Sequence, residues 1–368
     1  MSEKKHLYYF DYMRILAAVG VVFMHVAAQP LRGVMGGEWQ VLNVLTSLAF
    51  TAVPFFMMMS GYLLLSGERT ADISLLLKKR LPRLLVPLLF WTLVVVFYLM
   101  YRWHETTFAE FWARFLPALH KPAWIHFWYM YTLVALYVIS PVLSVALRNL
   151  NRQGHLFVLS IIGLITLKAV LVAFFPQWSA TYLNIDLLNK LTFFDGHLAT
   201  FILGYYLGKS DRRIPNGALL LGAFALLAVI TVGTSLASAS AGGYDPRFQT
   251  QSAGLEVLLA ACLFMFFKQT CNRPRKVLSR VPVVPLTYAI YFMHNILVGI
   301  MQEQHPTVTL WETLWMTAVN FVICYFVTKT AATVPGLCYA VTGLSFKEAC
   351  RSCNWVYTFK RIFQKASA

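Results

Sequence analysis

Charged residues are scarce in this sequence. Only 12% of its 368 residues are Asp, Glu, Lys or Arg, whereas about a quarter of a typical soluble domain is charged. The sequence also has no repeat of fixed period and no low-complexity linker. These deficits exclude a soluble globular domain and a repeat protein.

Cysteine is also scarce, and it indicates no chemistry. Of six cysteines, Cys350 and Cys353 form a lone C-x-x-C motif. Without a second pair or a nearby histidine this motif does not predict a zinc site, and cytoplasmic thiols stay reduced. The sequence shows no other cluster with metal-ligand spacing, so we expect no metal.

Hydrophobic residues make up 58% of the chain and fall into long runs. Each run is close to the length that crosses a bilayer as a helix. The sequence therefore predicts an all-α, polytopic integral membrane protein of about ten transmembrane helices. We expect one membrane domain, 1–345, and a cytoplasmic amphipathic basic tail, 346–368. The predicted spans are 8–28, 41–65, 84–102, 127–147, 156–175, 191–208, 217–237, 253–268, 283–301 and 312–332.

The net charge of +16 reflects membrane topology rather than nucleic-acid binding. The basic residues cluster at span ends on alternate loops: 22 lie in one set of segments and six in the other. Because basic residues favour the cytoplasmic side, both termini are predicted to be cytoplasmic. The first run is longer than a signal-peptide core and contains polar groups, so we expect it to be retained.

The first run, Tyr8 to Ala28, carries three groups that hydrocarbon disfavours: Asp11, Arg14 and His25. Arg14 and His25 lie eleven residues apart, which puts them on one helix face and about 16 Å apart along the axis. Asp11 lies one turn before Arg14 and can pair with it. These residues are candidates for a catalytic group, although a surface ion pair and a packing histidine are the alternatives.

Arg80 and Arg83 precede the third run, with a spacing that turns both to one side of a helix. Guanidinium groups bind phosphate in bidentate fashion, and the start of a helix favours an anion. We therefore expect a phosphorylated cytoplasmic ligand here, with positive-inside topology as the alternative. Ser60 and Gly61, near the inner end of the second span, favour close helix packing, and Ser60 is also a candidate for the ligand site.

Further polar and aromatic groups lie in later spans and form a second set of candidates for substrate binding. Asp195, His197 and Glu256 are expected at one depth, around a polar cavity that opens outwards. Trp128 and Tyr129 open the fourth span, where an aromatic belt is the alternative. Tyr288, Tyr291 and His294 share one face of the ninth span.

Together these residues make the chain resemble the membrane acyltransferase-three family, bacterial O-acyltransferases of cell-envelope glycans. Its R-x10-H motif is matched by Arg14 and His25, and its R-x-x-R motif by Arg80 and Arg83. The resemblance covers nearly the whole chain. The weaker matches are Ser60-Gly61-Tyr62, His126-x-Trp128-Tyr129 with Pro141, and Tyr288 with His294.

The resemblance implies a cytoplasmic acyl-coenzyme A donor, with acetyl-coenzyme A as the expected one, and a hydroxyl acceptor on an envelope glycan or lipid-linked saccharide. His25 is the expected general base, since imidazole titrates near working pH. Arg14, oriented by Asp11, would hold the donor or stabilise developing charge, and Arg80 and Arg83 would hold the coenzyme phosphates. The stand-alone branch, without an extracytoplasmic esterase-like domain, is expected.

Other functions stay open from the sequence. An exporter of a glycan or acyl group on the same fold, a proton-coupled transporter and a non-catalytic partner of a glycan synthase would use similar polar groups. The bilayer of the bacterial inner (plasma) membrane is the expected location, nucleic acid is not an expected partner, and a homo-oligomer is left open.

Overall fold

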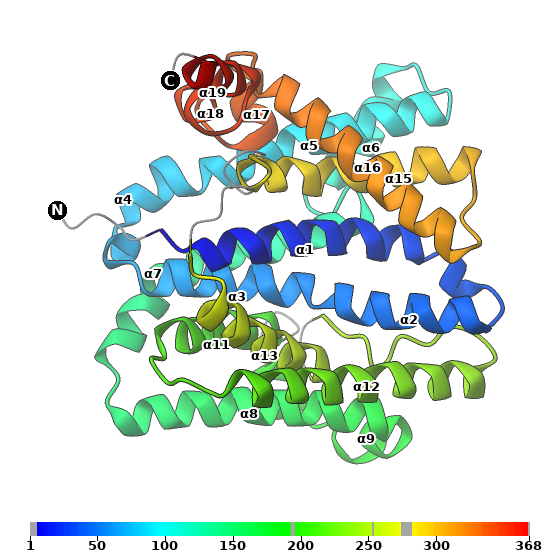
Figure 1. Ribbon diagram of the computed structural model, residues 1–368, viewed down its shortest axis with the longest axis vertical. Coiled ribbons are helices and arrows are strands. Elements are labelled where there is room, and N and C mark those ends of the chain that lie inside the picture. The colour runs from blue at the N-terminus through cyan, green and yellow to red at the C-terminus, as the bar shows by residue number, and fades with distance from the viewer. Residues whose placement is uncertain (1–5, 193–195, 252–253, 274–281, 367–368) are drawn as a thin grey trace. The chain divides into compact units, whose positions relative to one another are not determined.

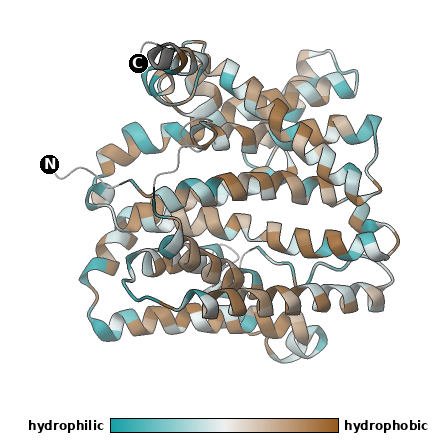
Figure 2. Cartoon of the chain, viewed as in Figure 1, coloured by the Kyte–Doolittle hydropathy of each residue, from teal (hydrophilic) through white to brown (hydrophobic). Residues whose placement is uncertain are grey.

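The computed structural model describes residues 6–192, 196–251, 254–273 and 282–366, and these residues form helices and loops without a strand (Figure 1). Eight of the described helices are long and apolar enough to cross a membrane. Hydrophobic residues fill the long helices, whereas hydrophilic residues gather at helix ends and loops (Figure 2). The chain is therefore an all-helical polytopic membrane protein, as predicted. The cytoplasmic side of its termini stays a prediction.

By its internal contacts the chain divides into two compact units, and two of the divisions fall inside helices α7 and α16. Unit 1 comprises residues 1–71, 140–275 and 305–317, and unit 2 comprises 72–139, 276–304 and 318–368. Helix α7 is Trp128–Asn149 and α16 is Leu310–Ala331.

Unit 1 is built around α1, α2 and α3, which pack on one another, while α12 packs on α2 (Figure 1). Helices α2 and α3 follow each other with only Thr51 between them. The helices of this unit are α1 (Tyr8–Ala27), α2 (Gly37–Phe50), α3 (Ala52–Leu65), α8 (Arg152–Phe174), α9 (Pro176–Tyr182), α10 (Asp186–Leu191), α11 (His197–Lys209), α12 (Asn216–Ala241) and α13 (Leu255–Thr270).

Unit 2 is built around α5, which packs against α6, α15 and α17. A short helix and a π-helical turn, Leu76–Arg80, lead into α5. The helices of this unit are α4 (Ile73–Leu75), α5 (Pro82–Arg102), α6 (Phe108–Ala118), α15 (Thr287–Gln304), α17 (Leu337–Thr342), α18 (Phe346–Ser352) and α19 (Trp355–Ala366).

Two predicted spans are helices shorter than the bilayer core, and only the first of them is also shorter than predicted. The helix predicted at 191–208 is α11, with 13 residues, and the helix predicted at 253–268 is α13, with 16 residues. At about 1.5 Å per residue they are about 20 and 24 Å long, less than the bilayer core. Each begins directly after a glycine with positive φ, Gly196 at 85° and Gly254 at 82°, a conformation that other residues rarely adopt.

Close helix packing in unit 1 depends on two glycines. A Cβ at Gly61 in α3 would lie 1.8 Å from the carbonyl oxygen of Phe201, and one at Gly204 in α11 would lie 2.1 Å from that of Met58. Neither position accepts a side chain without moving the backbone. The packing function that the sequence indicated for Gly61 is thus confirmed, and small residues let the two helices approach.

The tail that was predicted to be amphipathic is helical, and so is the segment that follows α5. The segment after α5 contains α6, and the tail contains α18 and α19. Helices α6 and α18 both start with a capping box, in which Thr107 pairs with Glu110 and Ser345 with Glu348. This motif satisfies backbone N–H groups that a helix start otherwise leaves without partners.

Candidate functional site

Helix α1 carries the first group of predicted residues without interruption. Since it runs from Tyr8 to Ala27, Arg14 and His25 lie on one continuous helix, on one face and about 16 Å apart along its axis. The Asp11 carboxylate pairs with His6 Nε2 at 2.6 Å. The pairing of Asp11 with Arg14 stays a prediction.

His25 lies in the last turn of α1 and is half-buried. Its neighbours Met24 and Val26 are buried, and Met24 belongs to a core cluster with Trp39. Just beyond the end of α1, a cavity of about 460 Å³ is lined by Gln29, Trp39 and other residues of unit 1. The Trp39 ring is fixed there, because its Nε1–H donates to Leu31 O at 2.9 Å. The helix that carries His25 thus leads to a preformed cavity.

Other candidates of unit 1 lie in α3, α11 and α13. Ser60 in α3 is half-buried. His197 begins α11 and Glu256 is the second residue of α13, with 3% and 0% of their surfaces exposed. Asp195 lies outside the described residues. Because His197 and Glu256 are buried, the outward-opening polar cavity around them stays a prediction.

Glu256 is a buried carboxyl group without hydrogen bonds in the part of the chain that is described. Neither of its carboxyl oxygens has a hydrogen-bond partner there. Burying a polar group without partners costs free energy, about 1–3 kcal/mol from protein substitutions.

The two arginines of the R-x-x-R motif do not share one regular α-helix, contrary to what their spacing predicted. Arg80 ends the π-helical turn, in which Leu81 N donates to Leu76 O at 2.9 Å, whereas Arg83 belongs to the first turn of α5. Pro82 stands between them and lacks the N–H that a regular helix would use, which is the physical reason for the irregular turn. Arg83 nevertheless lies at a helix start, as expected.

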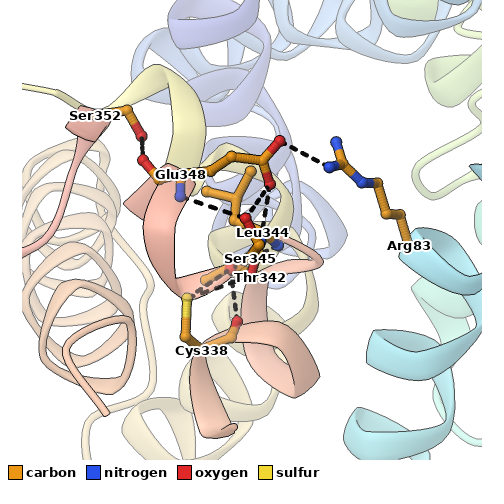
Figure 3. Close-up of polar contacts among 7 residues, drawn as sticks. All are labelled: Arg83, Cys338, Thr342, Leu344, Ser345, Glu348 and Ser352. Carbon is orange, nitrogen blue, oxygen red and sulfur yellow. Dashed lines mark hydrogen bonds and ion pairs between the residues drawn. The ribbon is translucent and has the colours of Figure 1, made fainter. Parts of the chain in front are cut away.

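The Arg83 side chain has a carboxylate partner from the C-terminal segment. Its Nη2 donates to Glu348 Oε1 at 2.7 Å, with 47% of the Arg83 and 42% of the Glu348 side chain exposed (Figure 3). Burial raises the pKa of the Glu348 carboxyl, but bonds from Ser345 and Arg83 outweigh burial and hold that pKa below its ordinary value. Glu348 is therefore ionised at neutral pH.

A cluster of rings in unit 2 joins the start of α7 to α15. The ring centroids of Tyr129 and Tyr291 lie 5.5 Å apart, and those of Tyr291 and His294 lie 6.1 Å apart. His126 lies 4.8 Å from His294, also between ring centroids. The other predicted residues lie beside this cluster: the Trp128 ring is 6.1 Å from Tyr129, and Tyr288 OH donates to Leu84 O at 3.2 Å. The structure thus brings together candidates from two predicted spans.

Backbone contacts assign the tautomers of the two histidines in this cluster. His294 Nδ1 lies 2.6 Å from Tyr291 O, and a carbonyl only accepts, so Nδ1 carries the proton and Nε2 the lone pair in the neutral ring. His126 Nε2 lies 3.3 Å from Phe292 O, while its Nδ1 accepts from Asn295 Nδ2 at 3.3 Å. Both nitrogens of His126 therefore bond α15, whereas the tautomer of His294 suits a base.

Sequence reasoning missed two residues of these sites. His126 was recognised only as part of a motif, and its bonds to α15 depend on tertiary structure. Glu348 was missed although its local pattern was visible: Ser345-x-x-Glu348 before an apolar residue predicts a capping box. What the pattern could not indicate is that the same carboxylate also binds Arg83.

Comparison with known families gives one result. A family model described as an acyltransferase domain, of the acyltransferase-3 type, matches residues 7–329. Comparisons with curated proteins and with solved structures find no match. The match includes both arginine motifs and His25, and it ends before the C-terminal segment that carries Glu348.

Proposed function

The chain belongs to the acyltransferase-3 family and is a multi-pass membrane acyltransferase, and from that premise we propose that it moves an acetyl group from cytoplasmic acetyl-coenzyme A to a hydroxyl of a cell-envelope glycan or lipid-linked saccharide. The observation that carries this proposal is the continuous helix α1, which holds Arg14 and His25 in the spacing of the R-x10-H motif. We assign the protein to the bacterial inner membrane.

In the proposed reaction His25 is the general base. It takes the proton of the acceptor hydroxyl while the hydroxyl oxygen attacks the thioester carbonyl carbon. The C–S bond then breaks, and the imidazolium returns the proton to the leaving thiolate, which gives free coenzyme A and an ester. Arg14 stabilises the negative charge that develops on the carbonyl oxygen. No proton is gained or lost overall.

Arg80 and Arg83 hold the phosphates of the donor in this proposal. Guanidinium groups match phosphate geometry, and the first turn of α5 adds N–H groups and a favourable dipole. The phosphates of coenzyme A are remote from its thioester carbonyl, so contacts to them contribute mainly uniform binding, which appears in KM rather than in kcat. Lysine lacks the paired N–H donors of the guanidinium group, so it should replace arginine only in part.

The cavity beyond α1 is the place we propose for the acceptor. Its volume, about 460 Å³, is in the range of small-molecule sites. Trp39 offers an apolar ring face, and Gln29 and Glu38 offer polar groups to hydroxyls. A Trp39→Ala variant should raise KM for the acceptor and leave KM for the donor unchanged.

An exporter on the same fold is the alternative, and acyl chemistry by the purified protein separates the two. Purified protein is incubated with acetyl-labelled coenzyme A and extracted envelope glycan, and labelled ester and free thiol are measured. We expect both products to form in equal amounts. An intact thioester under these conditions would leave export as the function.

The phosphate clamp is tested in the same assay. Arg80→Ala and Arg83→Ala should raise KM for acetyl-coenzyme A more than they lower kcat. Lys78→Ala is the matched control, because Lys78 is an exposed cation of the same turn. Unchanged donor KM in both arginine variants would refute the clamp.

A further inference from the structure

The C-terminal segment packs on the start of α5, although it lies beyond residue 329, where the family match ends. Val341 O accepts from Trp91 Nε1 at 3.2 Å. Gly343 has a φ of 70°, and a Cβ there would lie 2.5 Å from Arg83 O. Only glycine fits this backbone and this approach. The segment is therefore seated directly against the residue that carries the proposed donor contact.

Within this segment, the Glu348 carboxylate is fixed from two sides. Its Oε2 accepts from Ser345 N at 2.9 Å and from Ser345 Oγ at 2.8 Å, which leaves Oε1 directed at Arg83 Nη2 (Figure 3). Ser345 is itself held by the preceding turn, where Leu344 N donates to Thr342 Oγ1 at 3.1 Å. The carboxylate is thus held in one orientation, and it offers the Arg83 guanidinium a fixed hydrogen-bond acceptor.

Fixing Arg83 in this way lowers the cost of binding an anion. An arginine side chain has many rotamers, and ordering it on binding costs free energy. A guanidinium carries five N–H donors, and the described structure commits one terminal nitrogen to Glu348. The remaining edge can still form a bidentate pair with a phosphate.

We propose that Glu348 is a positioning residue, which holds the Arg83 guanidinium in the orientation that binds the donor's phosphates. The proposal rests on the function proposed for Arg83 above and goes beyond it, because it makes a segment outside the matched acyltransferase domain part of the donor site. Glu348 acts through Arg83 and does not touch the reacting atoms.

The test is Glu348→Gln. Glutamine also serves in a capping box, but Ser345 and Arg83 bond different oxygens of the carboxylate, and glutamine replaces one of these oxygens with an NH₂ donor. Because an exposed ion pair contributes little, we expect KM for acetyl-coenzyme A to rise about two- to fivefold with kcat unchanged. The dissociation constant of coenzyme A, measured by calorimetry, should rise by the same factor.

Glu110→Gln is the matched control, since Glu110 fills the same capping-box position at the start of α6. It should leave KM for the donor unchanged. The double variant Arg83→Ala with Glu348→Gln should bind coenzyme A no more weakly than Arg83→Ala alone, because a positioning residue has no effect once its partner is gone.

The outcomes separate this inference from the proposed function. If Arg83→Ala raises KM and Glu348→Gln does not, the positioning function is wrong and the clamp stands. A lower KM in Glu348→Gln would show that the carboxylate competes with the donor, which also overturns the inference. If Arg83→Ala itself has no effect, both proposals fail. Thermal unfolding of each variant confirms that the protein is folded.

Discussion

A buried carboxyl of unit 1 and two ionisable groups of unit 2 are held in different ways. In unit 2 both ring nitrogens of His126 bond α15, and Glu348 has bonds from Ser345 and Arg83. In unit 1 both carboxyl oxygens of Glu256 are buried without a hydrogen-bond partner among the described residues. Groups with satisfied bonds serve structure or positioning, whereas a polar group kept in an apolar helix without such bonds indicates use in binding or chemistry.

The largest effect is expected for His25→Ala. Loss of a general base lowers the rate by about 10²–10⁴-fold, while replacing a half-buried ring with a methyl group should leave the thermal midpoint nearly unchanged. Acetyl transfer and thermal unfolding are measured on the same preparation. The control is His155→Ala, a histidine of α8 bonded to Tyr206 OH at 2.9 Å, which should retain activity. Transfer at the wild-type rate in His25→Ala would make His294 the candidate base.

His126→Ala should have the opposite effect to His25→Ala: it should lower stability and leave the activity of the folded protein unchanged. Its removal leaves Phe292 O and Asn295 Nδ2 without their contacts to the imidazole, and each lost buried bond costs about 1–3 kcal/mol. The thermal midpoint should therefore fall, with activity falling only as the folded fraction falls. Normal stability with loss of transfer would place His126 in the reaction and would break the contrast between the two units.

Glu256→Met should stabilise the protein. Replacing a buried polar group that has no partner with an apolar one of similar size removes its desolvation cost, about 1–3 kcal/mol at most. Acetyl transfer should fall at the same time if the carboxyl is kept for use. Glu256→Gln is the control, since it keeps the shape and polarity and should not raise the midpoint. A lower midpoint in Glu256→Met would show that Glu256 is a structural group.

The sequence was sufficient for the fold class and for α1. Long apolar runs predict helices because hydrocarbon leaves backbone groups no other partner, and the spacing of Arg14 and His25 fixes their common face once the run is helical. The helix predicted at 191–208 was predicted too long because hydropathy averages over a run and does not register the positive φ of Gly196, directly before α11.

The site could be predicted only in part from the sequence, because its residues come from helices that are far apart in the chain. The rings of Tyr129 and Tyr291 come together from distant spans, and the bond between Arg83 and Glu348 joins residues 265 positions apart. Periodicity describes one helix at a time, so it cannot indicate which helices pack together. The irregular turn at Arg80 had a visible cause in Pro82, but its π-helical form depends on where the chain before it packs.

The smallest expected effect is the pH dependence of the Glu348 contacts. Because the folded-state pKa of this carboxyl lies below its ordinary value of 4.5, its contribution to stability is complete above that value and is lost as the pH falls through the lower folded-state pKa. The pair is exposed and screened by solvent, so the contribution is at most about 1 kcal/mol. The difference in thermal midpoint between wild type and Glu348→Gln should therefore be constant from about pH 8 to pH 6 and shrink below about pH 4.5. A difference that grows as the pH falls would mean that the carboxyl is protonated more readily in the folded protein, and Arg83 would then lack the fixed anion that positions it.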